Sequence, residues 1–188
     1  MRIAVFGAGA IGGHVAFRLA RGGADVSVVA RGAQGQAIAA KGIRVITPEL
    51  DEARRVACSA DPAALGKQDA VIVTTKATAL AEVARAIPPL LGPDTPVAYV
   101  MNGIPWWYFH EEGGPHAGTR LDALDPGGAL WDGVGIGRAI GGVVYSACTV
   151  IEPGVVRVAQ AKSRVILGEP DGTLSPRAKA IAAALEAG

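Results

Sequence analysis

Residues 7–12, Gly7-Ala8-Gly9-Ala10-Ile11-Gly12, have the composition and spacing of a phosphate-binding loop. The first glycine of such a loop permits a tight turn, the second lets the backbone approach a pyrophosphate, and the third lets a helix pack closely on a strand. Free N–H groups at the N-terminus of that helix then face the anion. The loop therefore predicts a bound phosphate ligand, and a glycine-rich turn without a ligand is the alternative.

Arg31 follows a second apolar run, Val26 to Ala30, at the place where many nucleotide-binding proteins have an acidic residue. That acid bonds the ribose hydroxyls of NAD or FAD, whereas here Asp25 stands at the opposite end of the run. A guanidinium can instead pair with a ribose 2′-phosphate through two parallel hydrogen bonds. We therefore expect NADP(H) as the cofactor, against the alternative that Arg31 is only a solvent-exposed arginine.

Two more polar residues follow apolar runs. Lys76 comes after Val71-Ile72-Val73, and Asn102 comes after the run over residues 95–101. Ligands bind at the carboxyl ends of strands in α/β sheets, so Lys76 is expected to bond a cofactor ribose or a substrate oxygen. Asn102 can donate and accept at once, which suits a ribose or a keto-acid carboxyl. The alternatives are a solvated lysine at a helix start and a turn-forming Asn-Gly pair.

Aromatic and sulfur-containing residues indicate packing more than chemistry. The run Trp106-Trp107-Tyr108-Phe109 is interpreted as core or interface, with a wall of a substrate cleft as the alternative. Cys148 has no neighbouring histidine or acid, so it is expected to pack in the core. Cys58 and Cys148 form no CxxC pair, which favours free thiols in a reducing cytoplasm. The three histidines show no metal-ligand spacing, and no metal is expected.

The elements that must position these residues alternate between strand and helix over the first hundred residues. A strand at 3–6, a helix that ends near Gly22 and a strand at 26–30 form a β-α-β unit. Further strands are expected at 43–46, 55–59, 69–75 and 95–101, and further helices at 33–40 and 78–91. This alternation predicts an α/β fold with a Rossmann-type, doubly wound parallel sheet.

The pattern changes after residue 113. Residues 113–142 are rich in glycine, and we expect a loop with one or two helical turns there. Strands are expected at 143–150, 155–159 and 165–167, forming a short antiparallel extension near the C-terminus. A helix begins at Ser175-Pro176. We expect a dinucleotide-binding domain over residues 1–170 and a C-terminal helix over residues 171–188.

Composition limits the classes of partner. The chain has 188 residues with a formal net charge of +1, and its basic residues are scattered. Nothing therefore indicates nucleic acid or an anionic membrane as a partner. Neither a targeting segment nor an apolar stretch of about 20 residues is visible, so we expect a cytoplasmic protein without a membrane span.

The motifs together resemble one family, the ketopantoate reductases (2-dehydropantoate 2-reductases), and specifically their N-terminal NADP-binding domain. The resemblance covers essentially the whole chain and rests on MRIAVFGAGAIGG, Arg31, VIVTTKA, MNGI and GGVVYSACTVIEPGVVRVA. It implies an NADPH-dependent oxidoreductase that converts a 2-keto acid to a 2-hydroxy acid in pantothenate biosynthesis.

The resemblance also implies roles for single residues. Gly7 to Gly12 would bind the pyrophosphate and Arg31 the 2′-phosphate. Lys76 and Asn102 would lie beside the nicotinamide ribose, with Asn102 also near the substrate. Cys148 would approach the cofactor.

Two departures from the family qualify these roles. The Trp106-Trp107 pair is not a general family feature and leaves the identity of the keto acid open. The family has a second, helical domain with the lysine that acts as general acid, so the general acid is expected beyond Gly188. The expected partner is a small-molecule 2-keto acid, and a homodimer stays open. The alternatives are a non-catalytic nucleotide-binding or sensing module and a related dehydrogenase for another keto acid or an imine.

Overall fold

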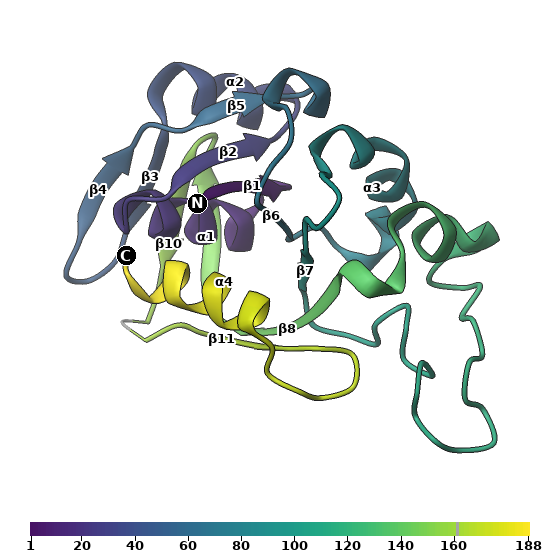
Figure 1. The fold of residues 1–188 in the computed structure, drawn as a ribbon. Coiled ribbons are helices and arrows are strands. Elements are labelled where there is room, and N and C mark those ends of the chain that lie inside the picture. The colour runs from purple at the N-terminus through teal and green to yellow at the C-terminus, as the bar shows by residue number, and fades with distance from the viewer. Residues whose placement is uncertain (161) are drawn as a thin grey trace.

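The computed structural model, which describes residues 1–160 and 162–188, contains two sheets with a helix, α1, between them (Figure 1). The larger sheet has seven strands in the order β11-β8-β7-β6-β1-β2-β5, and the smaller has four in the order β4-β3-β10-β9. The strands are β1 (Arg2–Phe6), β2 (Asp25–Val29), β3 (Ile43–Ile46), β4 (Asp51–Arg54), β5 (Ala57–Ser59), β6 (Ala70–Val73), β7 (Val97–Val100), β8 (Ala139–Tyr145), β9 (Cys148–Glu152), β10 (Val155–Val158) and β11 (Arg164–Gly168).

The α-helices are α1 (Ala10–Arg21), α2 (Gly32–Lys41), α3 (Leu80–Ala86) and α4 (Pro176–Glu186). Short 3-10 turns lie at Pro62–Leu65, Ala77–Ala79, Pro88–Leu90, Pro126–Gly128 and Ile136–Arg138, and a π turn lies at Leu130–Val134. The first of these turns is capped by Asp61, whose carboxylate accepts a hydrogen bond from the Ala63 N–H at 2.9 Å.

The larger sheet confirms the predicted Rossmann-type fold. Strands β5, β2, β1, β6, β7 and β8 are parallel to their neighbours, and only β11 runs antiparallel, against β8. Strands β6 and β7 are buried along their whole length, as expected for a parallel sheet that is covered on both faces. The carboxyl ends of the parallel strands therefore meet at one edge of the sheet.

The predicted strand over residues 143–150 is wrong, because the chain changes sheets within it. Strand β8 ends at Tyr145, and β9 begins at Cys148 in the smaller sheet. Strand β8 also begins at Ala139, inside the segment predicted as a loop. Glycines obscured it: Gly142 allows close approach to β7, where an added Cβ would lie 2.9 Å from Val100 Cγ2.

The segment between α2 and β6 was only partly predicted. The expected strand at 55–59 is shorter and forms β5 at the edge of the larger sheet. Strand β4 was not predicted, because Asp51-Glu52-Ala53-Arg54 has almost no apolar residues. It forms through pairing with β3, where an Arg44–Asp51 ion pair at 2.7 Å joins the two strands. Such cross-strand pairs stabilise a sheet without an apolar pattern.

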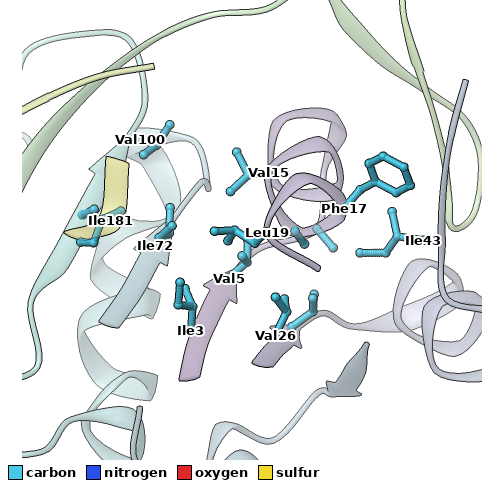
Figure 2. Close-up of a cluster of buried hydrophobic side chains, with 14 of the residues drawn as sticks. Ile3, Val5, Val15, Phe17, Leu19, Val26, Ile43, Ile72, Val100 and Ile181 are labelled. Carbon is cyan, nitrogen blue, oxygen red and sulfur yellow. The ribbon is translucent and has the colours of Figure 1, made fainter. Parts of the chain in front are cut away.

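Helix α1 has apolar side chains on two sides, and each side packs on one of the two sheets. Figure 2 shows Leu19 beside Val5 of the larger sheet, whereas Phe17 points toward Ile43 of the smaller one. Phe17 and Leu19 are fully buried. Each large side chain buried in this way contributes about 1.5–3 kcal/mol. This packing fixes the N-terminus of α1 at the carboxyl edge of the larger sheet.

The aromatic run packs on the opposite face of the larger sheet. Trp106 is fully buried, and its ring lies edge-on to Trp131 and Trp107 with centroids 5.1 and 5.0 Å away. Trp107 is also buried and contacts Tyr99 of β7. The core interpretation is confirmed for these two tryptophans, whereas Tyr108 is exposed. Such aromatic pairs add about 0.5–1.5 kcal/mol beyond the area they bury.

Helix α4 packs on α1 and β11, and its Ile181 is fully buried. As predicted, it begins at Ser175-Pro176, and the Ser175 hydroxyl accepts a hydrogen bond from the Ala178 N–H at 3.2 Å. The division of the chain between residues 170 and 171 stays a prediction. None of the helices in the described ranges has the length and apolar character needed to cross a bilayer.

Glu169→Gln is expected to lower the free energy of unfolding at neutral pH. The Glu169 side chain is 10% exposed, and the hydrogen bond from Arg177 of α4, followed by that from Ser175, holds its pKa below the ordinary value. The stabilisation is present above the pKa of the unfolded chain and is lost as pH falls through the folded-state pKa. Urea unfolding should show a loss of about 1 kcal/mol at neutral pH that shrinks as the pH falls below the ordinary pKa of Glu, about 4, and disappears below the folded-state pKa of Glu169. Glu186→Gln is the control, and equal losses at both pH values would contradict the prediction.

Candidate functional site

The glycine loop connects β1 to α1 at the carboxyl edge, and each glycine has a different role. Gly7 has φ +98°, a conformation that side chains disfavour. A Cβ on Gly12 would overlap the Gly7 carbonyl oxygen and Thr74 Oγ1, so close packing requires glycine there. A Cβ on Gly9 would meet no atom within 4 Å. Gly9 therefore leaves open space at the N-terminus of α1, where a ligand can approach the backbone.

The loop is held in place by the strands on either side of it. The Gly7 N–H donates to the Val29 carbonyl of β2 at 3.0 Å, and the Thr74 hydroxyl donates to the Gly7 carbonyl at 2.7 Å. Thr74 was not predicted as a site residue. The signal that could have found it is its place directly after the buried strand β6, where a short hydroxyl side chain can reach the neighbouring loop.

A second brace crosses from the loop to the smaller sheet. Gln34 of α2 donates through Nε2 to the Ala8 carbonyl at 2.7 Å and accepts from the Gly154 N–H at 3.0 Å. Gly154 lies in the turn between β9 and β10 with φ +82°. The Gln34 amide therefore links the turn between β9 and β10 to the glycine loop through two hydrogen bonds. Sequence patterns did not indicate this link.

A cavity of about 530 Å³ opens beside the loop and is lined by Gly7, Ala8, Gly9, Arg31, Thr75 and Glu82, among others. This volume lies within the range of small-molecule and cofactor sites. Thr75 Oγ1 is buried and has no hydrogen-bond partner within residues 1–160 and 162–188. Buried hydroxyls are normally paired, so Thr75 is an exception among the residues that line the cavity. Helix α1 has no acidic residue in its first turn and no side-chain cap, which leaves its N-terminal N–H groups to an anion.

Arg31 lines this cavity two residues after the end of β2, and its charge is paired. Its guanidinium forms an ion pair with Glu82 of α3, in which Nη2 donates to Oε2 at 3.1 Å and Nη1 donates to Oε1. The Arg31 side chain is 69% exposed and that of Glu82 is 48% exposed. Glu82 is 51 residues away in the sequence, so no local pattern could indicate it.

Lys76 and Asn102 lie at the same edge of the sheet but do not line the 530 Å³ cavity. Lys76 is exposed and directly precedes the turn that leads into α3. The Asn102 amide is already engaged, since it donates to the Val144 carbonyl and accepts from the Val144 N–H, both at 3.0 Å. One N–H and one lone pair of the amide remain for a ligand. The ligand roles of both residues stay predictions.

Cys148 begins β9 and does not line this cavity either. The Ser146 hydroxyl donates to its Sγ at 3.6 Å, and burial raises the pKa of the thiol. A raised pKa keeps the thiol neutral, which agrees with packing rather than with a nucleophile. Cys58 and Cys148 are both free thiols. In the described part of the chain, no three His, Cys, Asp or Glu side chains gather as a metal site would require.

His14 of α1 is a buried titratable group that sequence patterns left unassigned. Burial, followed by the charge of Arg18, lowers its pKa to about 4, so the ring is neutral at physiological pH. Its Nδ1 lies 3.2 Å from Ser146 Oγ, which in turn bonds Ser163 Oγ at 2.9 Å. These contacts fix the chain where β8 gives way to β9.

Comparison with known proteins gives consistent matches. Residues 3–172 match the model of the family described as ketopantoate reductase PanE/ApbA. The chain is 48% identical to a 2-dehydropantoate 2-reductase of Mesorhizobium japonicum over 183 residues, which cover 97% of this chain and 56% of the relative.

Solved structures show the same similarity. A protein of Ralstonia solanacearum MolK2 that is provisionally assigned as a ketopantoate reductase superposes with a TM-score of 0.92 and is 44% identical, covering 99% of this chain and 57% of that one. The 2-dehydropantoate 2-reductase of Geobacter metallireducens GS-15 has a TM-score of 0.79 and 30% identity, covering 100% and 55% of the two chains. The chain thus spans about half the length of the relatives it matches.

Proposed function

The chain belongs to the ketopantoate reductase PanE/ApbA family, and on this basis we propose that it is the NADP(H)-binding part of a 2-dehydropantoate 2-reductase. The reaction is the reduction of a 2-keto acid, 2-dehydropantoate, to its 2-hydroxy acid in pantothenate biosynthesis, in the cytoplasm. The observation that carries the proposal is the cavity beside the glycine loop, with open space at Gly9 and Arg31 at its edge.

The residues present fit a dinucleotide. The N-terminal N–H groups of α1 would hold the pyrophosphate, and the space at Gly9 would admit it. Arg31 would bind the ribose 2′-phosphate through the same two N–H groups that now contact Glu82. Thr75 lines the cavity between the glycine loop and α3. When bound, the nicotinamide supplies the hydride, while the protein supplies binding and orientation.

Lys76 and Asn102 are the groups we assign to the reacting end of the cofactor. The exposed Lys76 ammonium would donate to the nicotinamide ribose. The free N–H of the Asn102 amide would reach the ribose or the keto-acid carboxylate, while its bonds to Val144 keep the side chain in place. Cys148 would contribute a small side chain near the cofactor. Because Asn102 is held by β8, substrate position depends on the pairing of β7 with β8.

Arg31→Ala is expected to remove a preference for NADPH over NADH. A hydrogen bond to a charged group contributes about 1.5–3 kcal/mol, so NADPH affinity should fall about tenfold or more while NADH affinity changes little. Calorimetric titration of both cofactors measures the ratio. Arg21→Ala removes the same charge from the other end of α1 and should leave the ratio unchanged. Equal affinity of the unmodified chain for the two cofactors would contradict the assignment of Arg31.

A further inference from the structure

We propose that Glu82 is a specificity-determining residue, an internal carboxylate that competes with the ribose 2′-phosphate for Arg31. The inference rests on the proposed NADP(H) binding and adds a second residue to the subsite. It predicts that the protein discriminates less between NADP(H) and NAD(H) than Arg31 alone would make it.

The geometry of the pair supports competition rather than simple proximity. Both carboxylate oxygens of Glu82 accept from Arg31, one from Nη1 and the other from Nη2. These two N–H groups form the fork that a guanidinium presents to a phosphate. Within residues 1–160 and 162–188, neither side chain makes another ion pair. The carboxylate thus occupies one end of the Arg31 guanidinium, at which an anionic ligand could also bind.

The position of the pair links it to the cavity. Arg31 and Glu82 come from different elements, the N-terminal boundary of α2 and the first turn of α3, and both line the 530 Å³ cavity. A 2′-phosphate that binds this end of the Arg31 guanidinium therefore displaces Glu82. It then leaves an unpaired carboxylate beside a phosphate of the same charge sign, and like charges at close range repel.

The two cofactors meet this carboxylate differently. NAD(H) has a 2′-hydroxyl that needs no place on the guanidinium fork, so the ion pair can stay intact. A carboxylate near the ribose can also accept a hydrogen bond from that hydroxyl, as acidic residues do in NAD-binding proteins. Glu82 is thus expected to weaken NADP(H) binding without weakening NAD(H) binding.

Glu82→Gln is the direct test, because it removes the charge and keeps the shape. An exposed ion pair contributes up to about 1 kcal/mol, so NADPH should bind about two- to fivefold more tightly, and NADH no more tightly. Adenosine 2′,5′-bisphosphate should gain the same factor and 5′-AMP none, which localises the effect to the 2′-phosphate. Glu49→Gln is the matched control, because it changes the net charge by the same amount and Glu49 does not line the cavity.

The Arg31→Ala background tests whether the two residues act together. There, Glu82→Gln can no longer free a guanidinium for the 2′-phosphate, so that part of the gain should be lost and only the relief of like-charge repulsion should stay. Circular dichroism confirms folding, and Glu82→Ala repeats the comparison should the amide variant misfold.

The failures of the two proposals are distinguishable. Unchanged NADPH affinity in Glu82→Gln, or an equal gain for NADH, would overturn the role of Glu82 while NADP(H) binding stands. If the unmodified chain binds neither NADPH nor NADH, the proposed function itself is wrong.

Discussion

Gly9→Val abolishes NADPH binding and leaves the chain folded: this is the expected result of the most selective change at the site. The Cβ of a valine would meet no protein atom within 4 Å, and Gly9 has φ −67°, outside the left-handed region that disfavours side chains. It would, however, fill the space through which a pyrophosphate reaches the N-terminus of α1. Loss of even two charge-assisted hydrogen bonds corresponds to about a hundredfold or more in affinity. Titration with NADPH and circular dichroism of the same sample measure both properties.

Gly12→Ala provides the contrasting variant. Its added Cβ would overlap the Gly7 carbonyl oxygen and Thr74 Oγ1, so the loop or α1 must shift. Overpacking of this kind typically costs about 1–3 kcal/mol, which a thermal or urea transition detects. The two variants separate a glycine needed for a ligand from one needed for the fold. Undiminished NADPH binding by a folded Gly9→Val chain would show that the loop is only a turn.

Local patterns were sufficient for the parts of the fold built from neighbouring residues. The β1–α1–β2 unit and the glycine loop lie within 30 residues, and their apolar spacing, helix stop and glycines all favour the same structure. The helix after Ser175-Pro176 was predicted for the same reason. Where local signals agree with each other, the chain specifies its structure over short distances.

Contacts between distant segments could not be predicted from local sequence patterns. Strand β8 contains Gly141 and Gly142, which weaken any strand pattern, and it forms because those glycines pair with Tyr99 and Val100. The same limit applies to the site. Arg31 was indicated by its place after β2, but its contact with Glu82 depends on how α3 packs, which no short-range pattern describes.

The second prediction with a large expected effect concerns the catalytic rate of the chain. We expect the 188-residue chain by itself to bind NADPH but to reduce 2-dehydropantoate at no more than the background rate. Reduction of a ketone requires a proton at the developing alkoxide, and a positioned general acid contributes about 10²–10⁴-fold. Among the described residues at the carboxyl edge, Lys76 is the candidate donor, and we assign its ammonium to the cofactor ribose. The resemblance to the family assigns the general acid to the helical domain instead.

Substrate position should be lost as well as the proton donor. Asn102 is the single residue here that we assign to the keto acid, and half of its amide is engaged by Val144. One partly occupied amide cannot fix a small keto acid in a reactive orientation, and correct placement contributes about 7–11 kcal/mol to lowering such barriers. The assay follows the loss of NADPH absorbance with 2-dehydropantoate and with a panel of other 2-keto acids.

Two controls make an inactive result informative. NADPH binding measured on the same sample shows that the cofactor site is formed. The full-length Mesorhizobium japonicum relative, 48% identical over the matched region, serves as the positive control for turnover in the same assay. A bound cofactor without turnover would show that these 188 residues alone do not supply the proton donor and the substrate contacts. Turnover of about 1 s⁻¹ or faster, the range of complete enzymes, would instead mean that the chain holds its own proton donor. Lys76→Met would then identify it: loss of that turnover with NADPH affinity unchanged would move Lys76 from the ribose to the reacting oxygen.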